Sequence, residues 1–400
     1  MRSGKSTAGA RADWIISVGS SSPVAYPHLQ AADRDARDVY SFLSGSWSAT
    51  PNTSVLLTGL KASTKNVNIA LNEVLARRVT ESDRVFIYLS GHIDPDIRSI
   101  TGSFVTHDYS KEARNYGVNF RSLRHLVEDS IAGYILVVID GCHSGVVAQG
   151  NRTITSHWFH FSTGEMDSAV SNKTFITAVS SGTYAWERKQ KRNSDFTESF
   201  LSIIRDPKHL QFDLTIGSLF DELCKNAEQN GHSPPVKSGV EIGRNILIPA
   251  GSQRLHRAPL TRKMNNMPGW LQAAIDNSRS MHGKKVDCTF IRDNNWPDGS
   301  IIKPGKVIVK SWRVRNTGKI RWKGFFLKMV GAARGVGRIQ APILNPIPEL
   351  EPGQEVDIEV ELRMPAYEAS VYAEFKLTDS SGEYLLPTRQ GLYVSFDVKD

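Results

Sequence analysis

The feature that most constrains this chain is an apolar run that ends abruptly in polar and reactive residues. Residues 134–139 are continuously apolar and rich in β-branched side chains, which is typical of a strand covered on both faces of a parallel sheet. The sequence Asp-Gly-Cys-His-Ser-Gly follows directly at 140–145. Open α/β sheets bind their ligands at the carboxyl ends of the strands. The sequence therefore predicts an α/β domain with a site at this point.

Cys142 is the candidate nucleophile of that site. A lone cysteine at the end of a core strand is most often a small buried hydrophobe. Here Gly141 and Gly145 let the backbone turn tightly and approach a ligand. Asp140 and His143 are polar where a core strand stays apolar. These neighbours favour a reactive thiol over a packing role.

A second stretch has the same form. Residues 84–89 predict another apolar strand, and Ser-Gly-His follows at 90–92. A thiol needs a base to become a thiolate at neutral pH, and an imidazole from a neighbouring strand end can supply it. We therefore expect His92 to be the base for Cys142, with both residues at one edge of the sheet. His143 is expected to be a supporting group.

The Ser-Gly-His and Asp-Gly-Cys-His-Ser-Gly motifs resemble the two signature motifs of caspase-like cysteine peptidases, nearest to the metacaspase and bacterial caspase-like branch. His92 falls on the catalytic His of that family and Cys142 on its catalytic Cys. Four further segments are similar to the family: 29–36, 56–59, 175–181 and 195–201. The resemblance implies a thiol protease with a Cys–His dyad and a caspase-haemoglobinase-like α/β/α sandwich with a mainly parallel central sheet.

Hydrophobic periodicity predicts the same fold class. Strands are expected at 14–18, 54–57, 84–89, 134–139, 171–179 and 245–248, and helices at 33–43, 64–75, 123–127, 196–204 and 216–227. Strands that alternate with helices favour a parallel sheet with helices on both faces.

The resemblance also implies a preference for basic substrates. In metacaspase-like relatives, acidic residues at the positions of Asp35 and Asp140 form a pocket that selects Arg or Lys. An aspartate-selecting caspase would have an Arg at the position of Asp35. We therefore expect a protein substrate that is cleaved after Arg or Lys, with Ser180 as a further substrate-binding residue. By itself, Asp35 could equally be an acidic residue at a helix start.

One residue departs from the family pattern. The residue after the catalytic His is normally Gly, and here it is Ile93. In the family's mechanism the amides of that residue and of the Cys form the oxyanion hole, so the expected donors are Cys142 with Ile93 or Gly91. A β-branched side chain would be strained if the position required a positive φ. The alternative function is therefore an inactive pseudo-peptidase that acts as a scaffold or signalling interaction protein.

Residues 146–172 lack periodicity, and a stretch of this length in a compact domain is usually functional or disordered. In caspase relatives the corresponding stretch is cut during activation, so Arg152 and Lys173 are candidate processing sites. His157 and His160 lie without Cys or acidic neighbours, and we expect loop packing there rather than a metal site. The expected chemistry requires no cofactor, and a calcium requirement stays open.

Composition bounds the partners and the compartment. The net charge of +8 allows a nucleic-acid partner, although a solvated basic face is commoner, so nucleic-acid binding ranks below the two functions above. Three cysteines are too few for a disulfide framework and indicate a reducing compartment, with Cys224 and Cys288 expected in the core. No run of eighteen apolar residues occurs. We therefore expect a cytoplasmic protein without membrane contact.

The C-terminal part of the chain has another character. Residues 252–285 are basic, with helical periodicity only at 270–275, which predicts a spacer with one short helix. Residues 286–400 consist of short alternating segments separated by turns, which predicts an all-β sandwich. The expected division is a flexible tail at 1–12, a peptidase domain at 13–251, the basic linker, and the sandwich.

The sandwich resembles the Ig-like four-tryptophan domain of a selective autophagy receptor and of many bacterial proteins. The likeness lies in three segments: 289–300, 304–305 and 312–322. Trp312 and Trp322 match two of the four tryptophans, and Phe375 and Tyr393 stand where the other two are expected. Such domains bind proteins, so the resemblance implies a protein partner and a role in recruitment or autoinhibition.

Overall fold

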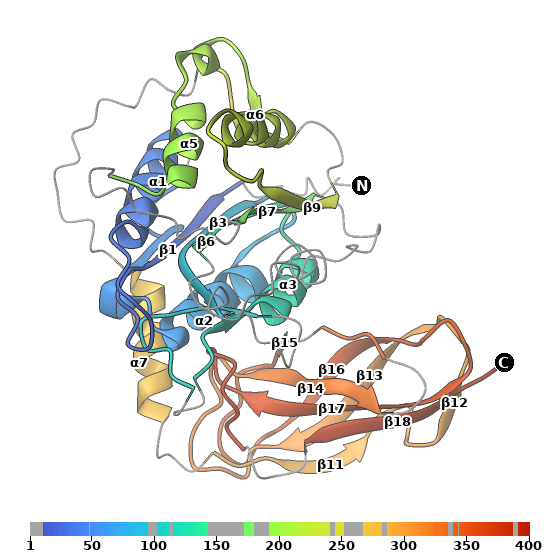
Figure 1. Ribbon diagram of the computed structural model, residues 1–400. Coiled ribbons are helices and arrows are strands. Elements are labelled where there is room, and N and C mark those ends of the chain that lie inside the picture. The colour runs from blue at the N-terminus through green and yellow to red at the C-terminus, as the bar shows by residue number, and fades with distance from the viewer. Residues whose placement is uncertain are drawn as a thin grey trace, which may run out of the picture. The chain divides into compact units, whose positions relative to one another are not determined.

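A computed structural model describes most of the chain, in two compact units that comprise Met1–Trp270 and Leu271–Asp400 (Figure 1). The described residues are 11–47, 49–94, 102–111, 115–142, 172–179, 192–240, 245–251, 267–281, 286–334, 339–342, 344–386 and 391–400. Within these ranges, no helix is both long and apolar enough to cross a bilayer.

The first unit is built on an eight-stranded sheet. Its main path is β2 (Ser54–Thr58), β1 (Asp13–Ser20), β3 (Arg84–Asp94), β6 (Tyr134–Cys142), β7 (Lys173–Val179) and β9 (Val236–Val240). The first five strands are parallel, and β9 is antiparallel to β7. The short strands β4 (Ser103–Phe104) and β5 (Val118–Asn119) continue the sheet beside the end of β3. The mainly parallel sheet is as expected from the sequence.

Two features at the edge of the sheet differ from expectation. β9 was not expected, because its sequence Val-Lys-Ser-Gly-Val has neither a continuous apolar run nor a branched residue at every second position. The expected last strand, β10 (Ile246–Ile248), pairs instead with β8 (Leu214–Thr215) in a separate two-stranded antiparallel sheet. Short segments of this kind carry too little pattern to reveal their partners.

Helices cover both faces of the sheet (Figure 1). On one face lie α1 (Ala32–Ser46), α5 (Asp195–Ile204) and α6 (Ile216–Gln229), and on the other lie α2 (Thr64–Glu73) and α3 (Phe120–Asp129). Shorter turns of helix occur at Gly59–Lys61, Val74–Arg78 and Pro207–Leu210. This three-layer arrangement confirms the α/β/α fold class.

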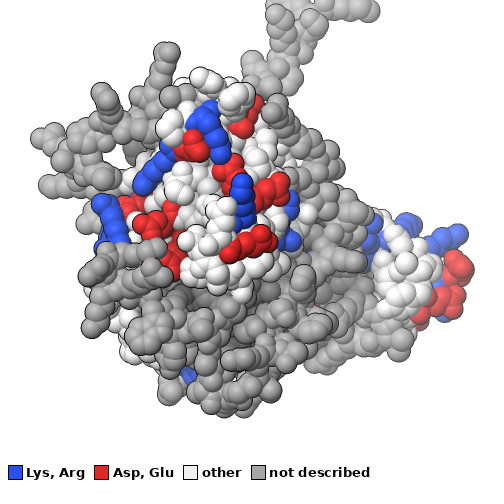
Figure 2. Space-filling model, turned by 45° about the horizontal axis from the view of Figure 1, so that its top comes forward, with Lys and Arg blue, Asp and Glu red and all other residues white. Residues whose placement is uncertain are grey.

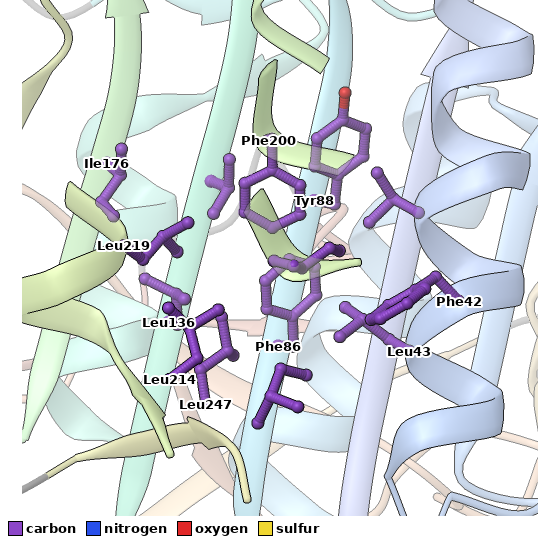
Figure 3. Packing of buried hydrophobic residues seen from close by; sticks show 14 of the residues in the cluster. Phe42, Leu43, Phe86, Tyr88, Leu136, Ile176, Phe200, Leu214, Leu219 and Leu247 are labelled. Carbon is purple, nitrogen blue, oxygen red and sulfur yellow. The ribbon is translucent and has the colours of Figure 1, made fainter. Parts of the chain in front are cut away.

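The core on the α1 side is formed by alternate residues of the central strands (Figure 3). Phe86 and Tyr88 of β3 pack beside Phe200 of α5, with ring centroids 6.2 and 6.5 Å apart. The figure also labels Phe42, Leu43, Leu136, Ile176, Leu214, Leu219 and Leu247 around them. Truncation of one such buried aromatic side chain to Ala costs about 3–5 kcal/mol, so this cluster anchors α1 and α5 on the sheet.

Helix α7 (Gly269–Met281) is longer than the short helix expected in the linker, and its first turn is packed. The indole N–H of Trp270 donates to the carbonyl of Asn52 at 2.8 Å, and its ring meets that of Trp14 at 6.3 Å. The Arg78 guanidinium lies 4.3 Å from the centre of the Trp270 ring. The start of α7 is therefore part of the first unit rather than a free spacer.

The second unit is a β-sandwich, as expected. One sheet contains β11 (Thr289–Asp293), β13 (Val307–Arg315) and β16 (Glu355–Arg363), and the other contains β12 (Ser300–Ile302), β18 (Leu392–Val398), β17 (Ala369–Thr378), β14 (Phe326–Arg334) and β15 (Leu344–Pro346). Trp312, Trp322 and Phe375 lie in its core. Tyr393 is 37% exposed and stacks on Tyr372, so it is not a core aromatic like the other three.

Charges of both signs share the surface. On the described part of the face shown in Figure 2, Lys and Arg side chains lie next to Asp and Glu side chains. The excess of basic residues is therefore not gathered into a single-sign patch on that part of the surface.

Candidate active site

The ends of β3 and β6 bring the two candidate catalytic residues together. His92 and Cys142 are register partners, preceded by the pairs Gly91–Gly141 and Ser90–Asp140. Adjacent strands of a sheet lie about 4.8 Å apart. The expected juxtaposition of positions 92 and 142 is thus present in the backbone, while the thiol of Cys142 lies outside the described part of the structure.

Ser90–His92 and Asp140–Cys142 lie within strands. β3 continues to Asp94 because Ile93 and Asp94 pair with β4. The pairing of β3 with β1 ends at Gly91, and the pairing with β4 follows it. β6 likewise continues to Cys142. The strand backbone therefore holds both candidate catalytic positions in a fixed register.

His92 is buried and oriented by the loop between β1 and α1. Its Nε2 lies 2.8 Å from the carbonyl oxygen of Pro27, and its ring meets that of Tyr26 at 5.2 Å. A carbonyl oxygen only accepts hydrogen bonds, so this contact requires a proton on Nε2. The sequence did not point to Pro27, because a backbone carbonyl leaves no mark in the residue type.

A second layer supports the His92 ring. The edge of Tyr26 meets Tyr109 at 5.5 Å, and the Tyr109 hydroxyl donates to the Asp94 carboxylate. Lys111 forms an ion pair with the same carboxylate at 3.1 Å. Burial, reinforced by the Asp94 charge and hydrogen bond, raises the pKa of both tyrosines above the ordinary value. Tyr26 therefore presents a neutral ring to His92.

The two expected pocket acids lie together and are bridged by one serine. Asp35 on α1 and Asp140 on β6 are both buried. The backbone N–H of Ser194 donates to Asp35 Oδ1 at 3.1 Å, and its hydroxyl donates to Asp140 Oδ2 at 2.5 Å. Ser194 is also the N-cap of α5, accepting from the N–H of Thr197. The start of α5 is thereby tied to both carboxyl groups.

Further neutral donors complete the pair. Asn193 Nδ2 donates to Asp35 Oδ1 at 2.9 Å, and Ser90 Oγ donates to Asp35 Oδ2 at 3.3 Å. Thr197 Oγ1 donates to Asp140 Oδ2 at 2.7 Å. Asn193 and Ser194 were not expected from the sequence, although the Ser-Asp-Phe-Thr start of α5 is a recognisable helix N-terminus.

Burial and neighbouring negative charge raise the pKa of both carboxyl groups. Burial, and then the charge of Asp140, raises the pKa of Asp35 to about 7, against the opposing effect of its hydrogen bonds. Burial likewise raises the pKa of Asp140. The pair therefore carries less than two full charges at neutral pH, and its charge grows as the pH rises through 7.

A third acidic residue, Asp38, lies on α1, the helix that also carries Asp35. Asp38 of α1 accepts two hydrogen bonds from Arg192, both at 3.0 Å, and one from Asn193 at 3.2 Å. The Arg192 side chain in this ion pair is 63% exposed. Residues 192–194 are thus fastened to the acidic side of α1 at several points.

Ile93 is compatible with a role in the oxyanion hole. The described non-glycine residues with positive φ are Asn172 and Trp296, so Ile93 does not carry the strain considered above. The N–H of Val105 donates to the carbonyl of His92 at 2.9 Å, which assigns His92 to the β4 side of the strand. Because successive residues of a strand point their N–H groups to opposite sides, the Ile93 N–H is directed toward β6.

Lys173 is unsuited to be a processing site in this fold. It is buried at the start of β7, and its Nζ donates to the carbonyls of Glu128 at 2.6 Å and Ser130 at 2.5 Å. Burial lowers its pKa to about 8. A peptidase needs an accessible, extended segment, so this expectation is wrong for the folded unit.

Several other expected residues lie outside the described part of the chain: Ser180, Arg152, His143, His157 and His160. Among the described residues, no group of three or more His, Cys, Asp or Glu could hold a metal ion. Cys224 and Cys288, expected in the core, are of intermediate burial, and Cys288 packs against the core of the second unit.

Comparisons with known proteins agree with this architecture. The Ig-like domain from next to BRCA1 gene matches residues 295–395. The chain is similar to Protein JOKA2 of Solanum tuberosum (29% identical over 100 residues, 25% of this chain and 12% of the relative). It is also similar to Protein ILRUN of Danio rerio (26% over 122 residues, 29% of this chain and 42% of the relative). Each match covers less than half of the relative's length.

The first unit has its own counterparts. Among solved structures, pro-Sf-caspase-1 aligns with 60% of this chain and 94% of its own length, at 10% identity and a TM-score of 0.37. The caspase domain family matches residues 23–257, which is more than half of the 400 residues. The chain therefore belongs to the caspase domain family and carries an Ig-like domain after its caspase domain.

Proposed function

We propose that this chain is a cysteine endopeptidase of caspase type that cleaves after Arg or Lys. The observation that carries the proposal is the registered pairing of His92 with Cys142 at the ends of β3 and β6, close to the buried acids Asp35 and Asp140. A base, a nucleophile and an acidic pocket are the elements that such a reaction requires.

The proposed reaction begins when His92, with Nδ1 as the accepting nitrogen, takes the proton of the Cys142 thiol. The thiolate attacks the carbonyl carbon of the peptide, and His92 then gives the proton to the leaving amine. The oxyanion is held by the amides of Cys142 and Ile93. We favour Ile93 over Gly91, because Ile93 directly follows His92, the position that the family resemblance assigns to the second donor. Water hydrolyses the thioester and regenerates the thiol.

The acidic residues support the proposed preference for a basic side chain. A guanidinium or ammonium group near Asp35 and Asp140 would favour their ionised forms and gain charge-assisted hydrogen bonds. Asp38, which already holds the guanidinium of Arg192, illustrates how this side of α1 binds a basic side chain. A substrate with Asp at the same position would meet like charge instead.

The Ig-like domain supports a role in protein recruitment or in regulation of the caspase domain. A family match is the basis for this part of the proposal. The partner is a protein of unknown identity, and the low cysteine content favours the reducing cytoplasm as the place of action.

The proposal is tested with purified full-length protein and peptides that release a fluorophore after Arg, Lys or Asp. Cleavage after Arg and Lys but not Asp is expected, and cleavage should disappear in Cys142→Ala. An enzyme that prefers Asp, or a Cys142→Ala variant that keeps its activity, would contradict the proposal.

The scaffold function is favoured by one observation. Asp35 and Asp140 already bond to Asn193, Ser194 and Thr197 of the same chain, as an occupied pocket would. A thiol-reactive peptide probe ending in Arg separates the two functions. Labelling of Cys142 supports a peptidase, and no labelling together with no cleavage supports a scaffold.

A further inference from the structure

The face of the sheet away from α1 is apolar beneath the two catalytic positions. Successive residues of a strand face opposite sides of the sheet. Ser90 bonds to Asp35 of α1, so Gly91 and Ile93 face the other side. Ile93 is fully buried and is the register partner of Phe104 in β4, which is also fully buried. A Cβ at Gly91 would lie 3.0 Å from Phe104 Cε2, so the Phe104 ring already covers this glycine.

The side chain of Ile93 lies so close to Gly141 that a residue with a Cβ atom would not fit at position 141. A Cβ at Gly141 would lie 2.2 Å from Cδ1 and 2.5 Å from Cγ1 of Ile93, and real Cβ atoms essentially never approach closer than 3.0 Å. The side chain of Ile93 thus occupies the space that a larger residue would need. Gly141 is the residue directly before Cys142, so this contact acts on the backbone that carries the nucleophile.

We propose that Ile93 is a positioning residue. Its side chain fills the space next to Gly141, where only a hydrogen atom fits, and thereby holds the Gly141–Cys142 backbone against His92. The inference rests on the peptidase function proposed above. Ile is accommodated at position 93 because position 141 is Gly. The two positions therefore form one size-matched unit.

Close packing explains why this contact matters for chemistry. Glycine has the greatest backbone freedom of any residue, so an uncovered Gly141 would let the following residue move. A well-packed branched side chain removes that freedom, because protein interiors transmit small changes of volume. A displacement of about 1 Å at a reacting group can lower the rate by about 100-fold. The Ile93 amide, directed toward β6, is held in place by the same contact.

The test compares Gly141→Ala, Ile93→Ala and the double variant Ile93→Ala with Gly141→Ala in the full-length chain. Gly45→Ala is the matched control, since nothing lies within 4 Å of a Cβ added there in α1. For each variant, kcat and KM are measured with an Arg-ended peptide. The rate of alkylation of Cys142 by iodoacetamide is followed against pH by peptide mass spectrometry, with Cys224 as an internal reference.

Gly141→Ala should lower kcat at least about tenfold, with KM changed less than about threefold, and should shift the pH midpoint of Cys142 alkylation. The double variant should recover kcat to within about threefold of wild type, because removal of the Ile93 branches makes room for the new methyl group. Ile93→Ala alone should lower kcat, and Gly45→Ala should leave every reading unchanged.

The proposal is overturned if Gly141→Ala behaves like wild type, or if the double variant is no better than Gly141→Ala. Should Gly141→Ala fail to fold, a double variant that folds and reacts supports the size match, and one that also fails to fold overturns it. If the wild type cleaves no peptide while Cys142 alkylation shows the same coupling, the proposed peptidase function fails and this inference stands.

Discussion

In the caspase unit, two carboxyl groups of like charge are buried together, whereas in the Ig-like unit a buried ammonium group meets a carboxylate. Within the described ranges, the hydrogen-bond donors to Asp35 and Asp140 are neutral groups such as Ser194, and burial raises the pKa of each carboxyl group. Lys310 is fully buried, and its Nζ donates to Asp293 at 2.5 Å and to the carbonyls of Asn295 and Trp296, both at 2.7 Å.

The difference separates the proposed substrate-binding pair from a structural ion pair. All three donors of the Lys310 ammonium are used, so its charge stabilises the turn before β12 and leaves nothing for a ligand. The acid pair is held in an arrangement that disfavours its own ionisation, and a cationic ligand would relieve this cost. The arrangement around Lys310 contributes to folding, and the Asp35–Asp140 pair is suited to binding.

The largest expected effect is on activity without loss of stability. Cys142→Ala and His92→Ala should each lower kcat/KM at least about 1000-fold, because the nucleophile and its base act as a unit. The melting temperature should change by only a few degrees. Peptide cleavage and calorimetry on the same samples check this, and residual cleavage near the wild-type rate in either variant would contradict the assigned roles.

Lys310→Met should lower stability and leave peptide cleavage nearly unchanged. Loss of the ammonium leaves Asp293 and two backbone carbonyls without their donor, which should destabilise the Ig-like unit by about 2–4 kcal/mol. Peptide cleavage by the caspase unit should stay within about twofold of wild type. Calorimetry of the full chain measures the first effect. A variant as stable as wild type would show that the buried charge is not structural.

Asp35→Asn should stabilise the caspase unit at high pH. The folded-state pKa of Asp35 is about 7, above the ordinary value of 3.8, so the folded state binds more protons than the unfolded state between these values. Stability contributed by the protonated carboxyl is therefore complete below about pH 4 and is lost as the pH rises through 7. The variant should be more stable than wild type by about 1–3 kcal/mol at pH 8, and no more stable at pH 4.

Denaturant unfolding at the two pH values measures this difference. Cleavage after Arg should fall in the same variant, because the pocket loses an ionisable carboxyl group. The amide of Asn can still accept from Asn193 and Ser194, so a drop in stability at pH 8 would argue that Asp35 is a structural charge like Lys310.

The smallest expected effect concerns Arg192. Its side chain is 63% exposed, so solvent screens its pair with Asp38. Arg192→Ala should change the free energy of unfolding by less than about 1 kcal/mol. If residues 192–194 merely close the acidic side of α1, cleavage after Arg should rise or stay constant. A large loss of stability would instead place this pair with the structural charges.

Much of the fold followed from pattern alone. The runs at 84–89 and 134–139 are long and β-branched, and helical periodicity is clear between them, so a parallel sheet with His92 and Cys142 at neighbouring strand ends could be predicted. The alternating segments after residue 286 predicted the sandwich equally well. Short or irregular segments such as β9 carried no such signal.

The details of the site depended on contacts between distant residues. The carbonyl of Pro27 reaches His92 across 65 positions, and Ser194 reaches Asp35 across 159. Backbone groups are the same in every residue, so such contacts leave no trace in residue type. The burial of Lys173 was likewise hidden, because a lysine near the start of a predicted strand usually reaches solvent.

By itself, the amino-acid sequence determined which residues carry reactive groups and at which strand ends they stand, because the periodicity of apolar side chains specifies strands and helices locally. Only the tertiary structure decided which groups orient, neutralise or cover them. Ile93 shows the difference: in the sequence it is a departure from the family, and in the fold its side chain fills the space that Gly141 leaves open. Volume and burial are properties of packed neighbours, and packing exists only once the chain has folded.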